Sequence, residues 1–216
     1  MDQPAVALGE REKSMRTEGE VGRIVWHDLL TDDVDTAKRF YAELLGWSYQ
    51  IEHATDSVWK QGEADYPLIV AGGEAHGGIV DPEDGGPSRW LAYVRVKDVD
   101  VVTANATTLG ATIVRPPFDV PGVGRNAVIQ DRQGAVICSY VPTHGFPPPG
   151  GTFVWDELVT DDVERAKGFY GALFDWQAVD TDTGRTPDYT VFKRADGTDA
   201  AGPCRVISSR RAQRVG

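Results

Sequence analysis

Two carboxylates occupy matching places in a duplicated segment, which makes them the residues best placed to do chemistry. Asp28 follows Trp26 by two residues, and Glu157 follows Trp155 by two residues. Alternate side chains of a strand share one face, so each acid lies on the face of its tryptophan. An acid on a half-buried face costs free energy unless it is paired or hydrated. Asp28 is therefore a candidate ligand contact or general base.

The duplication is read directly from the sequence. Residues 22–47 are GRIVWHDLLTDDVDTAKRFYAELLGW, and residues 151–176 are GTFVWDELVTDDVERAKGFYGALFDW. The two segments align without a gap at a constant offset of 129 residues. Chance does not produce such a match, so the chain contains a repeated supersecondary unit.

Each copy predicts a strand followed by a helix. Residues 24–30 form a short apolar run, and Asp32 or Asp33 can cap a helix. Apolar residues then recur at helical spacing until Gly46. Strand-like segments follow at residues 47–52, 57–61 and 66–71, so the unit is β-α-β-β-β.

A weaker copy lies between the two strong ones. Residues 90–97 alternate like a strand, a helix is expected from Asp98 to Gly110, and strands are expected at 112–115, 126–130 and 135–141. Residues 131–134 predict the turn of a hairpin. Tyr93 holds the strand position of Asp28 in this copy and is expected on the same face. Together with Trp26 it either lines a pocket for a planar or apolar ligand or fills the core.

These patterns predict an α+β chain of tandem βαβββ modules with five parts. They are a disordered leader at 1–21, a first domain at 22–142 (modules 22–80 and 89–142), a linker at 143–151, a half domain at 152–202, and a basic tail at 203–216. Modules one and two are expected to curl into one cup. Module three is expected to stand alone because a fourth module is missing, and it could form a homodimer.

The sequence resembles the vicinal-oxygen-chelate superfamily, which includes glyoxalase I, bleomycin-resistance proteins, fosfomycin-resistance enzymes and extradiol dioxygenases. The resemblance rests on the strand–Asp–helix–Phe-Tyr–Trp pattern of both copies, residues 96–100 (VKDVD), and the Gly124-Arg125 and Asp131-x-x-Gly134 ending. It covers residues 22–202 and implies the cup, with the ligand inside it.

The resemblance also implies positions for metal ligands. Metal-dependent members carry a His seven residues before the helix-capping Asp and a Glu seven residues after the Asp of the turn. Those positions hold Trp26, Trp155, Leu91 and Cys138 here. Trp, Leu and one thiol cannot assemble a hard oxygen and nitrogen site, so no metal and no cofactor are expected.

Arg125 and Cys138 complete the candidate ligand contacts, beside Trp26, Asp28 and Tyr93. The alternative for Asp28 is a salt bridge at the rim of the cup, to Arg95 or Arg125. Cys138 is a nucleophile only if a nearby base lowers its pKa, and a small buried hydrophobe is the alternative.

The histidines and the glycine pairs favour structural roles. His27 is next to the first ligand position but should face the helix, and His53, His76 and His144 share no spacing that suggests a cluster. Gly72-Gly73 and Gly77-Gly78 fit connections between strands, since no strand-then-helix context of a phosphate loop surrounds them.

Composition excludes several partners. The net charge of −11 argues against nucleic acid and an anionic membrane surface, and two cysteines fit a reduced cytoplasmic setting. The sequence therefore favours a protein that binds a small molecule in a metal-free cup. The alternative is a metal-independent lyase, isomerase, hydrolase or oxygenase-like enzyme that uses a cup carboxylate.

Overall fold

The computed structural model describes residues 20–55, 62–82, 86–182, 184 and 189–205. The chain divides into two compact units, residues 1–154 and 155–216, and each is described by itself. Most of the predicted leader and tail, and the predicted strand at 57–61, lie outside the described residues. No helix among the described residues is long and apolar enough to cross a membrane.

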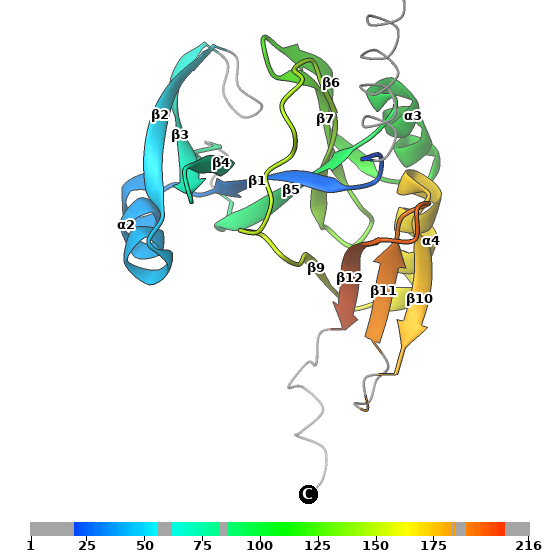
Figure 1. Cartoon of the computed structure of the whole chain (residues 1–216). Helices are drawn as coiled ribbons and strands as arrows, with labels where there is room; N and C mark the ends of the chain where they lie inside the picture. Colours follow the sequence, from blue (N-terminus) through cyan, green and yellow to red (C-terminus); the bar gives the residue numbers. More distant parts are fainter. Residues whose placement is uncertain (1–19, 56–61, 83–85, 183, 185–188, 206–216) are drawn as a thin grey trace, which may run out of the picture. The chain divides into compact units, whose positions relative to one another are not determined.

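Unit 1 is built on one eight-stranded sheet with the order β2-β3-β4-β1-β5-β8-β7-β6. The central strands β1 and β5 pair antiparallel, whereas β1–β4 and β5–β8 pair parallel. The β2–β3 and β6–β7 hairpins stand at the two ends of this sheet, with β1 and β5 between them (Figure 1). The strands are β1 (Ile24–Leu30), β2 (Ser48–Thr55), β3 (Glu63–Ala71), β4 (Glu74–Val80), β5 (Arg89–Arg95), β6 (Thr112–Val120), β7 (Gly124–Gln130) and β8 (Val136–Pro142).

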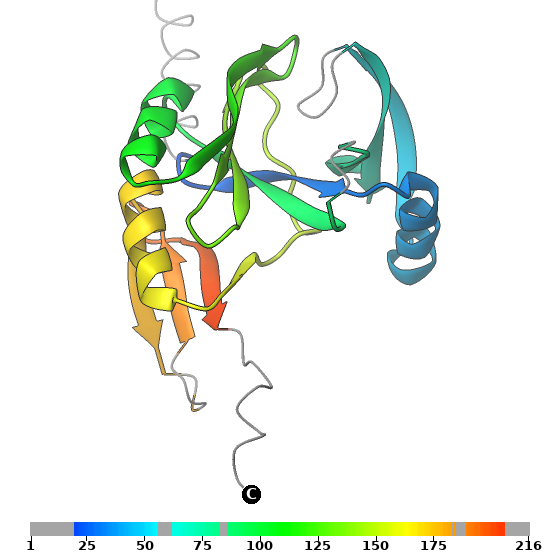
Figure 2. The ribbon, with the colours of Figure 1, turned by 180° about the vertical axis from the view of Figure 1, so that it is seen from behind.

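Two helices pack on the outside of this sheet. Helix α2 (Val34–Leu45) and helix α3 (Val99–Thr108) begin after Asp33 and Asp98, whose carboxylates accept backbone N–H groups of the first turn. Helix α2 ends at Gly46, which adopts a left-handed φ of 69°. Helix α3 packs on β6, β7 and β8 (Figure 2).

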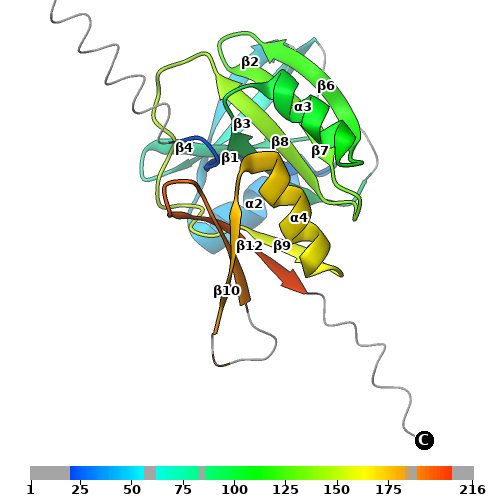
Figure 3. The same cartoon turned by 90° about the vertical axis from the view of Figure 1, so that its right-hand side faces the viewer.

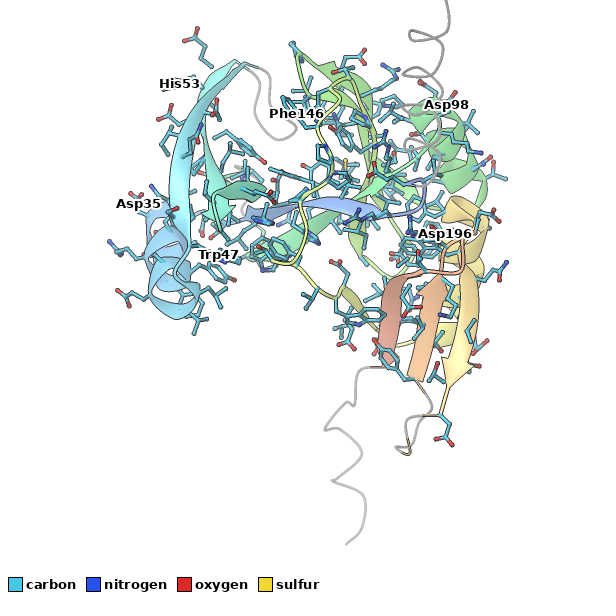
Figure 4. All side chains as sticks on the ribbon, in the orientation of Figure 1. Asp35, Trp47, His53, Asp98, Phe146 and Asp196 are labelled. Atoms are coloured by element: carbon cyan, nitrogen blue, oxygen red, sulfur yellow. The ribbon has the colours of Figure 1, made fainter. Side chains whose placement is uncertain are left out.

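Unit 1 has a separate apolar cluster on each face. One lies under α2 and includes Leu29, Trp47, Ile69 and Ile79; the Trp47 side chain lies on the side of α2 toward the sheet (Figure 4). The other joins both modules across β1 and β5, and we call it the inner cluster. Its buried members are Val25, Leu30, Val80, Leu91, Tyr93, Val120, Val128, Cys138 and Tyr140.

The α+β class is confirmed, and two of the expectations need correction. The third strand after the helix of the first module is β4, so Gly77 and Gly78 lie inside a strand, and their prediction as a connection was wrong. Phe153, which was placed in the third module, belongs to unit 1, because its ring stacks on His27 with centroids 4.0 Å apart.

Unit 2 carries the elements of one module. Strands β9 (Glu157–Thr160), β10 (Gln177–Thr181), β11 (Tyr189–Lys193) and β12 (Asp199–Arg205) form a sheet with the order β10-β11-β12-β9. Helix α4 (Val163–Phe174) packs on this sheet (Figure 3). Asp162 caps the start of α4, and the rings of Tyr170, Trp176 and Phe192 form the core beneath it.

Candidate ligand-binding site

Asp28 is a fully buried carboxylate held by three neutral donors. Its Oδ1 accepts from the Tyr66 hydroxyl at 2.5 Å and from Trp26 Nε1 at 3.1 Å, and its Oδ2 accepts from the Tyr93 hydroxyl at 2.5 Å. Trp26 Nε1 also donates to the Tyr66 hydroxyl at 2.9 Å. Asp28 is 2% exposed. We call Trp26, Asp28, Tyr66 and Tyr93 the acid cluster.

Strand geometry explains why these four side chains meet. Trp26 and Asp28 share one face of β1, and the antiparallel register places Tyr93 of β5 directly opposite Trp26. Tyr66 reaches Asp28 from β3 by passing over Gly78 of β4. A Cβ atom at Gly78 would lie 2.2 Å from the Tyr66 hydroxyl oxygen, so only glycine leaves room for the ring.

The electrostatics of the acid cluster are dominated by burial. Loss of hydration raises the pKa of Asp28 above its ordinary value, and the hydrogen bonds from Tyr66, Tyr93 and Trp26 lower it in part. Burial and the neighbouring Asp28 charge raise the pKa of both tyrosines well above 10, so both hydroxyls remain donors at neutral pH. Asp28 is therefore stabilised by neutral donors in an apolar setting.

The salt bridge proposed as an alternative for Asp28 is wrong. Arg95 pairs with Glu20. Arg125 binds Asp100 of α3 through Nε at 2.7 Å and Asp119 of β6 through Nη1 at 2.8 Å. Among the residues that the structure describes, no ion pair between a Lys or Arg and Asp28 occurs within 4.0 Å.

The structure brings four of the five predicted contacts together and leaves one apart. Trp26, Asp28, Tyr93 and Cys138 gather at the inner cluster, and Cys138 lies beside Tyr93 in the β5–β8 register. Arg125 is occupied by its two carboxylates beside α3, so its placement in the cup was wrong. The reason is strand alternation, because Arg125 precedes the inward-facing Asn126 and Val128 by an odd number of residues.

Cys138 behaves as a buried hydrophobe. Burial first, and then the Asp28 charge, raise the pKa of its thiol well above 9, so the reactive thiolate is disfavoured. Its Sγ lies 3.8 Å from Asn126 Oδ1 and 3.5 Å from the Ser139 carbonyl oxygen. This environment supports the prediction that Cys138 is a small buried hydrophobe and argues against its being a nucleophile.

Each of the four histidines makes a different contact. His27 stacks on Phe153, His53 contacts Asp65 at 2.8 Å, and His76 contacts the Ala71 carbonyl at 3.1 Å. His144 contacts the Tyr140 hydroxyl at 3.0 Å. Over the described ranges, no group of three or more His, Cys, Asp or Glu side chains could hold a metal ion.

The residues at the ligand positions of the superfamily do not fit a divalent metal. Trp26 Nε1 donates to Asp28 and Tyr66, Leu91 has no donor atom and is fully buried, and the Cys138 thiol is held protonated. A divalent cation requires deprotonated or lone-pair ligands, so this donor set lacks what such an ion needs.

A glyoxalase-like domain profile matches residues 24–139, which span the whole acid cluster. The chain belongs to the glyoxalase-like domain family. "Putative glyoxylase CFP32" of Mycobacterium tuberculosis is 30% identical over 189 residues, covering 84% of this chain and 70% of its own length. "Anthracycline biosynthesis protein DauV" of a Streptomyces species is 29% identical over 182 residues, covering 74% of this chain and 63% of its own length.

Solved structures confirm the fold of this glyoxalase-like protein. A homoprotocatechuate 2,3-dioxygenase variant from Brevibacterium fuscum superposes with a TM-score of 0.59 at 18% identity, covering 86% of this chain and 54% of that enzyme. A 4-hydroxymandelate synthase variant from Streptomyces coelicolor gives a TM-score of 0.55 at 15% identity, covering 86% and 62%. The chain thus spans between about half and two thirds of these enzymes.

Sequence reasoning missed two members of the site, Tyr66 and Gly78. A signal for both was present, because each strong copy carries a Tyr-x-aliphatic strand before a small-residue–Gly pair. Tyr66 precedes Gly78 by 12 residues, and Tyr189 precedes Gly202 by 13. The spacing differs by one residue, so a gapless alignment does not pair the two tyrosines.

Proposed function

We propose that unit 1 binds a planar or apolar small molecule without a metal, at the inner face that carries the acid cluster. The observation that carries this proposal is Asp28, a buried acid with a raised pKa and three neutral donors. Charged groups placed in apolar surroundings cost free energy, and perturbed pKa values gather at functional sites.

The neighbours of Asp28 suggest which ligands fit. Trp26, Tyr66 and Phe118 are partly exposed beside the inner cluster, so their rings are available to contact a ligand. Flat aromatic faces favour planar or apolar molecules. Two Streptomyces relatives are named for anthracycline biosynthesis, and an anthracycline is a planar aromatic molecule, which makes it the first probe.

The test is calorimetric titration and thermal shift of the whole chain with an anthracycline, bleomycin and aromatic metabolites, in EDTA. A ligand at one hundred times its dissociation constant adds about 2.7 kcal/mol to the free energy of unfolding. We expect Trp26→Phe and Asp28→Asn to weaken binding, while Arg125→Gln leaves it unchanged. Equal affinity in all four proteins would place the ligand elsewhere.

Acid–base catalysis by Asp28 is the second candidate function. It is favoured by the raised pKa of Asp28, since a carboxyl that titrates closer to neutral pH is a better proton acceptor and donor. If it is correct, Asp28→Asn abolishes turnover of a bound compound and retains part of its affinity. A ligand that binds and is recovered unchanged supports binding alone.

A further inference from the structure

The β6–β7 hairpin of unit 1 carries one arginine on each of its faces. Arg125 of β7 lies opposite Asp119 of β6 and binds it on the outer face. Arg115 of β6 lies opposite Val128, which is a buried member of the inner cluster. Residues that lie opposite each other in an antiparallel pair share one face, so Arg115 is on the inner face of the sheet.

A bulge in β6 brings Phe118 to the same face as Arg115. Side chains three residues apart on a regular strand face opposite sides. Here the three steps along β6 from Arg115 to Phe118 match two steps along β7, which restores the shared face. Pro116 and Pro117 lie between them, and β6 tolerates these prolines because it stands at one end of the sheet.

The guanidinium of Arg115 is held by this aromatic neighbour. Its central carbon lies 3.7 Å from the centre of the Phe118 ring. Phe118 packs against the inner cluster, as Trp26 and Tyr66 do. A guanidinium that stacks on a ring keeps its N–H donors at its planar rim, where they can bind acceptors in pairs. The inner face therefore carries a positioned positive charge beside partly exposed aromatic rings.

Arg115 and Asp28 act on the same buried thiol. Burial raises the pKa of Cys138 most, the charge of Asp28 raises it further, and the charge of Arg115 lowers it. Cys138 is on β8, which lies two strands from β1 and two strands from β6. Arg115 and the acid cluster therefore flank one stretch of the inner face, with Cys138 between them.

We propose that Arg115 binds the carboxylate of a planar aromatic acid whose ring contacts the aromatic side chains of the inner face. This inference rests on the proposed function and names the class of its ligand. The rim of a guanidinium matches the two oxygens of a carboxylate, and such charge-assisted hydrogen bonds are stronger than neutral ones. The partly exposed Trp26 and Phe118 offer flat surfaces to the ring.

Two probes of one shape test the charge of the ligand. Anthraquinone-2-carboxylate and anthraquinone-2-carboxamide share a flat ring system, and only the first is ionised at neutral pH. Titration calorimetry of the full chain measures the affinity for each probe. We expect the carboxylate to bind at least about tenfold more tightly than the carboxamide, because hydrogen bonds to charged groups are stronger than neutral ones.

Three variants test whether Arg115 is the source of this preference. Arg115→Gln should lower the affinity for the carboxylate to that for the carboxamide, and should change the carboxamide affinity much less. Arg115→Lys keeps the charge and loses the paired donors, so it should retain part of the preference. Arg125→Gln is the matched control, since it removes the same charge from the outer face and should keep the full preference. Thermal unfolding checks that each variant is folded.

The outcomes separate this inference from the proposed function. Equal affinities of the wild type for the two probes, binding of neither, or a preference that survives in Arg115→Gln would overturn the assignment of Arg115. An arginine that only shields Phe118 from water gives one of these results. If Arg115→Gln does not fold, the preference of Arg115→Lys decides, and a full preference in that variant counts against paired binding. The proposed function fails only if the anthracycline, bleomycin and the aromatic metabolites do not bind either.

Discussion

The Tyr93 hydroxyl donates to Asp28 Oδ2 at 2.5 Å, and this bond joins the two modules of unit 1 across the β1–β5 junction. The other two donors to Asp28, Trp26 and Tyr66, come from the first module. The second module therefore contributes one polar atom to the cluster, at the point where the two halves of the sheet meet.

Tyr93→Phe should lower the free energy of unfolding by about 1–3 kcal/mol, because it removes one partner of a buried charged acceptor. It should also raise the pKa of Asp28 further, since this hydrogen bond lowers it. Urea denaturation at several pH values measures both effects. Tyr140→Phe is the control, because its hydroxyl donates to the Val123 carbonyl and does not touch Asp28. Equal pH dependence in the two variants would contradict the assignment.

Asp28→Asn should gain stability relative to the wild type as the pH rises. Burial raises the folded pKa of Asp28 above its ordinary value of 3.8, so the folded chain holds a proton that the unfolded chain releases. The stability from this proton is complete below the unfolded pKa and is lost as the pH rises through the folded pKa. The difference between variant and wild type should change by at most about 1.4 kcal/mol per pH unit in that window. If the stability of Asp28→Asn relative to the wild type falls as the pH rises, the folded pKa of Asp28 lies below its ordinary value and the assignment is contradicted.

Gly78→Ala should displace the Tyr66 ring and cost about 1–3 kcal/mol, as overpacking of a core does. The added methyl group would lie 2.2 Å from the Tyr66 hydroxyl. Gly168→Ala is the matched control, since nothing lies within 4 Å of its Cβ position in α4, and it should be neutral or stabilising. Combining Gly78→Ala with Tyr66→Ala in a double-mutant cycle should recover part of the loss. Additive effects would mean that the glycine does not act through Tyr66.

Arg125→Gln should change the free energy of unfolding by no more than about 1 kcal/mol, because its partners Asp100 and Asp119 are exposed to solvent. It should leave ligand affinity unchanged. A large loss of affinity, measured by titration calorimetry, would restore the sequence-based assignment of Arg125 to the site.

Purification without chelators should yield less than one divalent metal ion per ten chains by elemental analysis, and added zinc, nickel, manganese or iron should not raise the melting temperature. The reason is the Trp26, Leu91 and protonated Cys138 set at the ligand positions. One bound ion per chain, lost on dialysis against EDTA together with stability, would contradict this.

The parts of the fold and of the site that could be predicted from the sequence are those that a repeated or periodic pattern specifies. The duplicated segment predicted the boundaries of β1 and α2 within about a residue, because capping and periodicity are local properties. Alternation also placed Asp28, Trp26 and Tyr93 on one face. Strand alternation could not predict that Tyr66 joins the site, because its contact with Asp28 spans 38 residues and depends on the register of β3 and β4. Arg125 was misplaced for a related reason, since which face of β7 turns inward is decided by packing with α3.

The order in which the polar contacts can form follows from their lengths along the chain. Trp26, Asp28 and Tyr66 are linked within one module over at most 40 residues. Tyr93 reaches Asp28 over 65 residues, from the first strand of the second module. Local contacts close before distant ones, since loop closure costs entropy. We therefore expect Asp28 to stay hydrated during folding until β5 docks on β1. Joining the halves of the sheet and dehydrating this carboxylate are then the same kinetic event.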